Sequence, residues 1–358
     1  MLIIDGHLDL AMNAMEWNRN LKESVYAIRE REQGMTDKLD RGKGVVALPE
    51  LRKGKIGLVV ATQISRYVEK GSSLPGWHSP EQAWAQAQGQ RAWYKAMEEV
   101  GEMVQITDLP SLENHIKLWQ DDAVPVQKKP VGFILSLEGA DSLIDLSYLE
   151  KAHQYGLRAL GPAHYGPGRY AQGTGMSGPL GQPGLELLKE MDRLNIILDV
   201  THLTDEAFWQ ALDLFKGTVW ASHHNCRALV HHQRQLGDDQ IKALIDRGAV
   251  IGGALDAWML GNNWIRGTSD PLKEGITLEK LIDHYDHICQ MAGNSRHIAI
   301  GSDLDGMFGK EQTPHDLETI ADLGNLKHLL ENRGYKAEDM ENIFHGNWLR
   351  IMRKAWNK

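Results

Sequence analysis

Short apolar runs recur along this chain, and the intervals between most of them leave room for a helix. Each run is nearly continuous in its apolar character and does not alternate with polar residues. Strands of a parallel sheet that is covered on both faces have this composition. We mark eight such runs, at residues 2–9, 56–65, 131–138, 157–164, 195–202, 218–223, 249–256 and 297–303.

Several segments between these runs have the pattern of helices. Ser79 and Pro80 supply an N-cap and a first-turn proline for a long helix. The segment from Leu185 to Leu194 places its apolar residues on one face, and residues 238–246 and 278–291 do the same. Eight strands that alternate with helices predict the α/β class and a (β/α)8 TIM barrel.

The length of 358 residues suits one barrel with insertions, and no Pro/Ser/Gly linker divides the chain. We therefore predict a single catalytic domain over residues 1–358. The glycine-rich segment 162–183 is expected to be a long loop on the rim where barrels place function. Residues 337–356 are expected to form two short helices that close the barrel base or make a subunit contact.

Charge and composition exclude several classes of protein. The formal net charge is -9 and no long Lys/Arg run occurs, which argues against nucleic-acid binding and adhesion to an anionic membrane. Two cysteines give no disulfide framework and fit a reducing compartment. No apolar stretch approaches the roughly 18 residues of a membrane span, and the start lacks a signal-peptide pattern. We expect a cytoplasmic enzyme.

Ligand-type side chains stand where the predicted strands end. In the first run, His7 and Asp9 are two residues apart and so project from the same face of a strand. The carboxyl ends of barrel strands meet at one rim, so these side chains should converge there. The full set is His7, Asp9, Glu138, His164, His202, His223 and Asp303.

So many buried carboxylates and imidazoles are costly unless cations neutralise them. Two divalent ions about 3.5–4 Å apart would satisfy these ligands and can share a bridging carboxylate and a bridging water. Water between two such ions loses a proton near neutral pH and becomes a nucleophile. The predicted chemistry is therefore metal-assisted hydrolysis.

Other interpretations stay open for individual residues. Glu138 can be a buried ion-pair partner, and His202 can be a core histidine that its neighbours satisfy. Only one imidazole of the Ser222-His223-His224 segment can point into the barrel; we favour His223, with His224 as the substitute. Asp305 can serve beside Asp303 or can cap a turn.

Six motifs in order resemble the membrane dipeptidase (renal dipeptidase) family of zinc peptidases, a branch of the amidohydrolase-like metal-dependent barrels. They are Asp5-Gly6-His7-Leu8-Asp9-Leu10, Ser136-Leu137-Glu138-Gly139, Asp199-Val200-Thr201-His202-Leu203, Ala221-Ser222-His223, Gly301-Ser302-Asp303-Leu304-Asp305-Gly306 and Gly346-Asn347-Trp348-Leu349-Arg350, with Arg234 after the fourth. The resemblance covers essentially the whole chain.

This resemblance implies a binuclear zinc dipeptidase whose nucleophile is a hydroxide that bridges two Zn²⁺ ions. One ion would be held by His7 and Asp9 and the other by His202 and His223, with Glu138 bridging them. A D-residue at the C-terminal position of the dipeptide is often accepted in the family, and some members hydrolyse β-lactams.

The resemblance also implies roles for three further residues. His164 would stabilise the oxyanion of the scissile carbonyl. Arg234 would bind the terminal carboxylate of the substrate, a role that suits a bidentate guanidinium. Asp303 would carry a proton from the water to the leaving amine.

The chain departs from the family pattern at Ala11, where proline is common, at His224, where serine is common, and in the segment 165–173. Arg169, Tyr170 and the loop 258–264 are candidate substrate contacts that could select another small amide or lactone, such as an N-acyl amino acid or a cyclic amide. A non-catalytic binding barrel is the remaining alternative. Homo-oligomerisation is compatible with the sequence.

Overall fold

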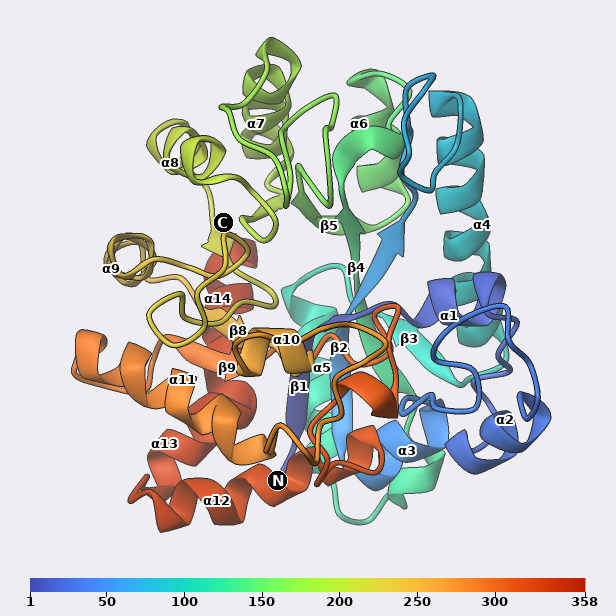
Figure 1. Cartoon of the computed structure of the whole chain (residues 1–358), viewed down its shortest axis with the longest axis vertical. Coiled ribbons are helices and arrows are strands. Elements are labelled where there is room, and N and C mark those ends of the chain that lie inside the picture. The colour runs from blue at the N-terminus through green and yellow to red at the C-terminus, as the bar shows by residue number, and fades with distance from the viewer. Residues whose placement is uncertain (358) are drawn as a thin grey trace.

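The computed structural model describes residues 1–357 and confirms the α/β class with a barrel of parallel strands. Figure 1 shows the strands at the centre of the molecule and the helices around them. The strands are β1 (Ile3–Leu8), β2 (Ile56–Ile64), β3 (Met103–Gln105), β4 (Val131–Glu138), β5 (Leu157–Gly161), β6 (Ile197–Asp199), β7 (Val219–Trp220), β8 (Ile251–Gly253) and β9 (Ile298–Ile300).

The strand order shows how the barrel closes. One sheet runs β1-β2-β4-β5-β6-β7 and a second pairs β8 with β9, all in parallel. Backbone bonds from Ala221 N to Val250 O (2.9 Å) and from Gly252 N to Ala221 O (2.8 Å) join the two sheets after β7. At the other seam, Asp303 N donates to His7 O at 3.3 Å. The first and last strands thus meet beside the predicted metal ligands.

A buried carboxylate strengthens this last seam. Asp5, on β1, accepts bonds from Ser302 N at 2.8 Å and from Ser302 Oγ at 2.5 Å. It also accepts from His7 N at 3.2 Å. The side chain therefore fixes the carboxyl end of β1 against the end of β9.

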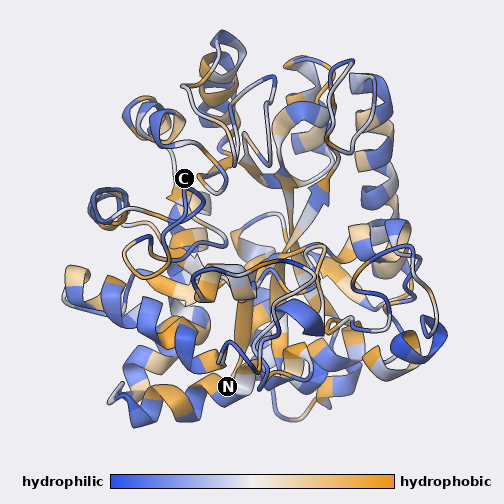
Figure 2. Ribbon diagram, in the orientation of Figure 1, coloured by the Kyte–Doolittle hydropathy of each residue, from blue (hydrophilic) through white to orange (hydrophobic). Residues whose placement is uncertain are grey.

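Each of the eight predicted runs contains a strand, but most strands are shorter than predicted. The run 195–202, for example, contributes only β6, because the residues after Asp199 leave the sheet to build the site. One further strand, β3, was not predicted; it has three residues and pairs with β4, outside the main strand order. Figure 2 shows the hydrophobic residues concentrated on the central strands and the inward sides of the helices.

The predicted helices are present, with small changes at their ends. Ser79 caps α4 by accepting from Gln82 N at 3.2 Å. No helix within residues 1–357 combines the length and apolar character needed to cross a bilayer. The longer helices are α4 (Pro80–Glu99), α5 (Leu109–Gln120), α7 (Gln182–Leu194), α8 (Asp205–Leu214), α9 (Asp238–Asp246) and α11 (Leu278–Ala292). The shorter ones are α1 (Leu10–Glu16), α2 (Val25–Arg31), α3 (Leu48–Lys53), α6 (Ser147–Gln154), α10 (Ala257–Leu260) and α12 (Leu326–Asn332).

The C-terminal segment differs from the prediction of two separate helices. A π-helical turn, Asn342–Gly346, joins α13 (Ala337–Glu341) to α14 (Asn347–Trp356) without a break. The indole of Trp348 donates to Ile300 O at 2.8 Å and contacts the ring of Trp220. A Cβ on Gly6 would lie 2.2 Å from this indole, so only glycine fits there. The segment therefore closes the barrel beneath β1, β7 and β9.

Helix α11 supports the loop that follows β7. The ring of His284 accepts a bond from Cys226 N at 3.1 Å through Nδ1, and burial lowers the pKa of His284 to about 4. A protonated ring could no longer accept this bond. The neutral ring therefore stabilises the loop that carries His223.

We predict that replacing His284 by asparagine makes stability less sensitive to acid. The histidine pKa is about 4 in the folded chain and 6.5 in the unfolded chain, so its contribution is complete above pH 6.5 and declines as the pH falls towards 4. The contribution of His284 to the free energy of unfolding that is lost in acid is about 3 kcal/mol at most. Denaturant unfolding of wild type and His284→Asn across this range measures the difference. The control is His328→Asn, whose side chain is 78% exposed; parallel curves for wild type and His284→Asn would contradict the prediction.

Candidate metal centre

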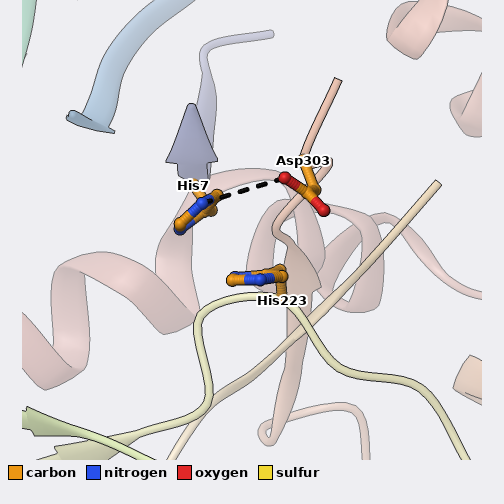
Figure 3. Close-up of side chains that lie close together, drawn as sticks. All are labelled: His7, His223 and Asp303. Atoms are coloured by element: carbon orange, nitrogen blue, oxygen red, sulfur yellow. Dashed lines mark ion pairs between the residues drawn. The ribbon is translucent and has the colours of Figure 1, made fainter. Parts of the chain in front are cut away.

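The structure brings the predicted ligands together at the carboxyl ends of the strands. His7 and Asp9 lie at the end of β1, and Glu138 is the last residue of β4. His202 and His223 follow β6 and β7, and both side chains are buried. Figure 3 shows His7 facing Asp303 and His223 across this rim.

The carboxylate of Glu138 lies between two groups of histidines. Its Oε1 is 3.2 Å from His202 Nε2 and 3.5 Å from His223 Nε2. Its Oε2 is 3.6 Å from His7 Nε2. The Nε2 atom of His7 is also 3.8 Å from Asp9 Oδ2 and 3.8 Å from Asp303 Oδ1. Each oxygen of one carboxylate thus faces a different set of ligands.

Three overlapping sets of side chains have ligand atoms close enough to surround a cation. Within each set, all the ligand atoms lie within 4.8 Å of one another. The sets are His7, His223 and Asp303; Glu138, His164 and His202; and His7, Asp9 and Glu138.

Two buried atoms of this cluster lack the partners that buried polar atoms need. Within residues 1–357, His7 Nε2 and Asp9 Oδ1 have no hydrogen bond. The Nε2 atoms of His202 and His223 approach each other at 3.2 Å. Buried polar atoms without partners are costly, and a divalent cation among nitrogen and carboxylate ligands removes that cost. The residues therefore fit a metal ion.

The electrostatics of the cluster also favour a cation. Burial alone would lower the pKa of His7, but the carboxylates of Glu138, Asp9 and Asp303 raise it to about 10. The negative potential that would hold a proton on His7 would also attract a metal ion, which displaces such protons when it binds. Burial holds the pKa of His202 and of His223 well below the ordinary value, so both rings are neutral and can be ligands.

Hydroxyl groups orient the two neutral histidines. Thr174 Oγ1 lies 2.9 Å from His202 Nδ1, and Ser222 Oγ lies 2.9 Å from His223 Nδ1. A hydroxyl oxygen can accept a hydrogen bond from a protonated Nδ1, and the ring then keeps its Nε2 lone pair for a metal. Thr174, from the loop after β5, was not predicted because nothing in its local sequence marks it.

Two site residues have an unusual backbone conformation. His202 has φ 70° and Asp303 has φ 57°, both in the left-handed region. Residues other than glycine hold this conformation at functional sites where the surroundings enforce it.

Asp305 helps to hold the backbone of the turn beside Asp303 in this conformation. Its Oδ2 accepts from Val46 N at 2.9 Å and lies 3.8 Å from Arg19 Nη1. Its carbonyl accepts from Asn13 Nδ2 at 2.8 Å. Asp305 therefore stabilises the turn through these contacts. Of its two candidate roles, the structure favours the structural one over service beside Asp303.

The ligand cluster opens into a cavity of about 520 Å³. Its lining includes Asp9, Glu138, His164, His202, His223, Arg234 and Asp303, together with Arg66, Tyr165, His232, Asp256, Trp258, Trp264 and Arg266. His224 is absent from this lining and from the three ligand sets, so of the two adjacent imidazoles it is His223 that faces the cluster.

Arg234 lies deep in this cavity with part of its guanidinium unpaired. Nη2 donates to His223 O at 2.9 Å, while Nε and Nη1 are buried and have no partner within residues 1–357. Burial lowers the pKa of Arg234. A buried cation with free donors is a suitable partner for a carboxylate of a ligand.

The structure does not bring the predicted contacts Arg169 and Tyr170 to the cavity. The guanidinium of Arg169 donates to Leu143 O at 2.7 Å and to Ile144 O at 3.0 Å. Tyr170 is buried in the hydrophobic core. Position in a glycine-rich loop suggested a place at the functional rim, but Arg169 binds the turn after β4 and Tyr170 packs into the core.

Sequence reasoning missed several lining residues. Arg66 follows β2, and its Nη2 lies 2.6 Å from His164 Nδ1. Asp256 accepts from Trp258 Nε1 at 2.7 Å and from Gln312 Nε2 at 2.9 Å, and burial raises its pKa to about 7. Asp256 stands at the end of the seventh predicted run, a position that favours the rim, but it was given no role. Arg66 directly follows the second predicted run, and nothing in the sequence indicates its contact with His164.

Comparison with known proteins identifies relatives over the full length. The model of the family described as membrane dipeptidase (Peptidase family M19) matches residues 1–357. Dipeptidase tcpJ of Claviceps purpurea is 29% identical over 63% of this chain and 52% of its own length. The chain thus matches about half the length of this curated relative.

Two solved structures share the fold. One is the dipeptidase AC, a metallopeptidase of family M19, with a TM-score of 0.80 at 23% identity, covering 100% of this chain and 99% of that one. The other is a metallopeptidase from Rhodobacter sphaeroides that holds a phosphinate mimic of the dipeptide L-Ala-D-Ala. It has a TM-score of 0.79 at 22% identity and covers 99% of both chains.

We predict that Glu138→Gln lowers the total metal content of the protein, because it weakens every metal-binding set that Glu138 joins. Each Glu138 oxygen faces a different ligand set, so one substitution weakens both. Elemental mass spectrometry after dialysis against metal-free buffer measures the loss. The control is Asp141→Asn, a buried carboxylate outside the three ligand sets that accepts from Arg169 N. Full metal retention in Glu138→Gln would contradict the prediction.

Proposed function

The chain belongs to the membrane dipeptidase family, and we propose that it is a dipeptidase that works with two zinc ions. The observation that carries this proposal is the position of Glu138 between His7 on one side and the His202 and His223 pair on the other. A carboxylate in that position can bridge two ions.

In this proposal, His7 and Asp9 would hold one ion, His202 and His223 would hold the other, and Glu138 would be a ligand shared by both. Nitrogen and carboxylate oxygen ligands of this kind suit zinc. When bound, such ions acidify a water and polarise the scissile carbonyl.

The residues around the metal ligands bind and orient the dipeptide. Arg234 pairs with its terminal carboxylate, because Nε and Nη1 of the buried guanidinium have no partner in the described part of the chain. His164, at the cavity wall, donates a hydrogen bond to the carbonyl oxygen as negative charge develops there.

Asp303 is the proton carrier in this proposal. Burial raises the pKa of Asp303 well above its ordinary value, which suits its carboxylate to accept a proton from the attacking water. It then gives that proton to the nitrogen of the leaving amine. The Rhodobacter structure holds a mimic of L-Ala-D-Ala. We therefore propose that this chain also hydrolyses dipeptides with a D-residue at the C-terminal position.

Replacing Asp303 by asparagine is expected to lower kcat by about 10²–10⁴-fold, as for loss of a general acid–base group. The amide keeps the shape of the side chain but cannot carry the proton. Metal content, measured on the same preparation, should stay as in the wild type. A parallel loss of metal would make Asp303 a ligand, since His7 and His223 lie within ligand distance of it.

The test of the proposed function is hydrolysis of a panel of L–L and L–D dipeptides by the zinc-loaded protein, each with a free or an amidated C-terminus. We expect turnover of the free-carboxylate dipeptides only. Arg234→Met should raise KM for these about 100-fold, because a buried carboxylate then lacks its cation.

The matched control is Arg227→Met, because Arg227 pairs with Asp205 at 2.7 Å and does not line the cavity. Turnover of amidated dipeptides as fast as free ones would overturn the assigned role of Arg234. Turnover of N-acyl amino acids or lactones in place of dipeptides would overturn the dipeptidase proposal.

A further inference from the structure

Arg66 is a half-buried cation at the wall of the cavity, and its main side-chain contact is a histidine. It follows β2, whereas His164 follows β5, so the two residues come from separate loops. Arg66 Nη2 lies 2.6 Å from His164 Nδ1, and Nη1 donates to Pro75 O at 3.2 Å. Within residues 1–357, no carboxylate forms an ion pair with Arg66, and its Nε has no partner.

The chemistry of this contact fixes the protons on the histidine. A guanidinium carries donors only and accepts no hydrogen bond. The Nδ1 atom of His164 must therefore present its lone pair to Arg66. A neutral imidazole carries one proton, so that proton lies on Nε2.

His202 and His223, the two neutral histidines of the ligand cluster, have the opposite hydrogen-bonding arrangement at Nδ1. The partners at Nδ1 of His202 and His223 are the hydroxyls of Thr174 and Ser222, which can accept a hydrogen bond from Nδ1–H. Those rings can thus present the Nε2 lone pair. His164 lies within ligand distance of Glu138 and His202, yet with Nδ1 covered by Arg66 and a proton on Nε2 it has no free lone pair for a metal.

We propose that Arg66 is a positioning residue that holds His164 in the Nε2–H tautomer, so that the ring serves as a hydrogen-bond donor and not as a metal ligand. The proposal deepens the function proposed above, because the donor role of His164 belongs to that function. Arg66 acts through the imidazole and not on the substrate.

The first experiment reads the tautomer directly and does not depend on turnover. Long-range ¹H–¹⁵N spectra of zinc-loaded protein with ¹⁵N-labelled histidine distinguish the two tautomers, and the His164→Ala protein identifies the His164 signals. We expect the Nε2–H form in the wild type and in Arg66→Lys, which keeps a side chain that can only donate. In Arg66→Met we expect a mixture of both tautomers.

The matched control is Arg158→Met. Arg158 is half-buried on β5, the strand that precedes His164, and among residues 1–357 its guanidinium donates only to the backbone carbonyls of Thr107, His153 and Leu157. This protein should keep the wild-type tautomer. An unchanged tautomer in Arg66→Met, or an Nδ1–H form in the wild type, overturns the proposal.

The second experiment is a double-mutant cycle on dipeptide hydrolysis. Arg66→Met should lower kcat at least tenfold and change KM less than threefold, since the donor acts on the developing oxyanion. In the His164→Ala background, the same substitution should change kcat less than twofold. An equal loss in both backgrounds means that Arg66 contacts the substrate itself, which overturns the proposal. If the wild type hydrolyses no dipeptide, the proposed function fails, and the spectra still decide the role of Arg66.

Discussion

The organisation of the site depends on the contacts of the Glu138 carboxylate with the histidines around it. This carboxylate stands at the end of a fully buried strand and faces His7 with one oxygen and His202 and His223 with the other. A buried carboxylate amid several others is unfavourable in a dry interior unless cations or donors compensate it. The cluster is thus arranged for a positive charge that the surrounding protein side chains do not fully supply.

The barrel holds this cluster in place with buried polar bonds that do not involve the ligand atoms. Asp5 joins the ends of β1 and β9 through Ser302. Asp199 performs a similar task between β6 and β7, since its Oδ1 accepts from Thr201 N at 3.0 Å and from Ser222 N at 3.1 Å. Buried carboxylates near the carboxyl ends of the strands therefore set the direction in which the ligands leave the sheet.

The sequence was sufficient to predict the barrel and the convergence of the ligands, because both follow from local composition. A buried parallel strand must be apolar along its length, and a polar residue at its end must lie at the rim, as for Glu138 and His7. The strand β3 was missed because three residues carry no periodic pattern. The single-domain organisation, the cytoplasmic location and homo-oligomerisation stay predictions.

Loop residues were beyond prediction because their contacts depend on how separate loops meet. Nothing local to Arg66 or Thr174 indicates a histidine partner, yet both lie against rings of the site. For the same reason Arg169 was assigned wrongly to the cavity, since the carbonyls that bind it belong to the turn after β4.

These loop contacts account for different roles among chemically identical side chains. A histidine offers a metal its lone pair only if the other ring nitrogen keeps the proton, and it donates to an oxyanion only if that proton is on the side of the substrate. Hydroxyls at Nδ1 of His202 and His223 permit the first state, and the guanidinium at Nδ1 of His164 enforces the second. The strands bring the imidazoles to one rim, and the loops between them decide which ring presents a lone pair at Nε2 and which presents a proton there.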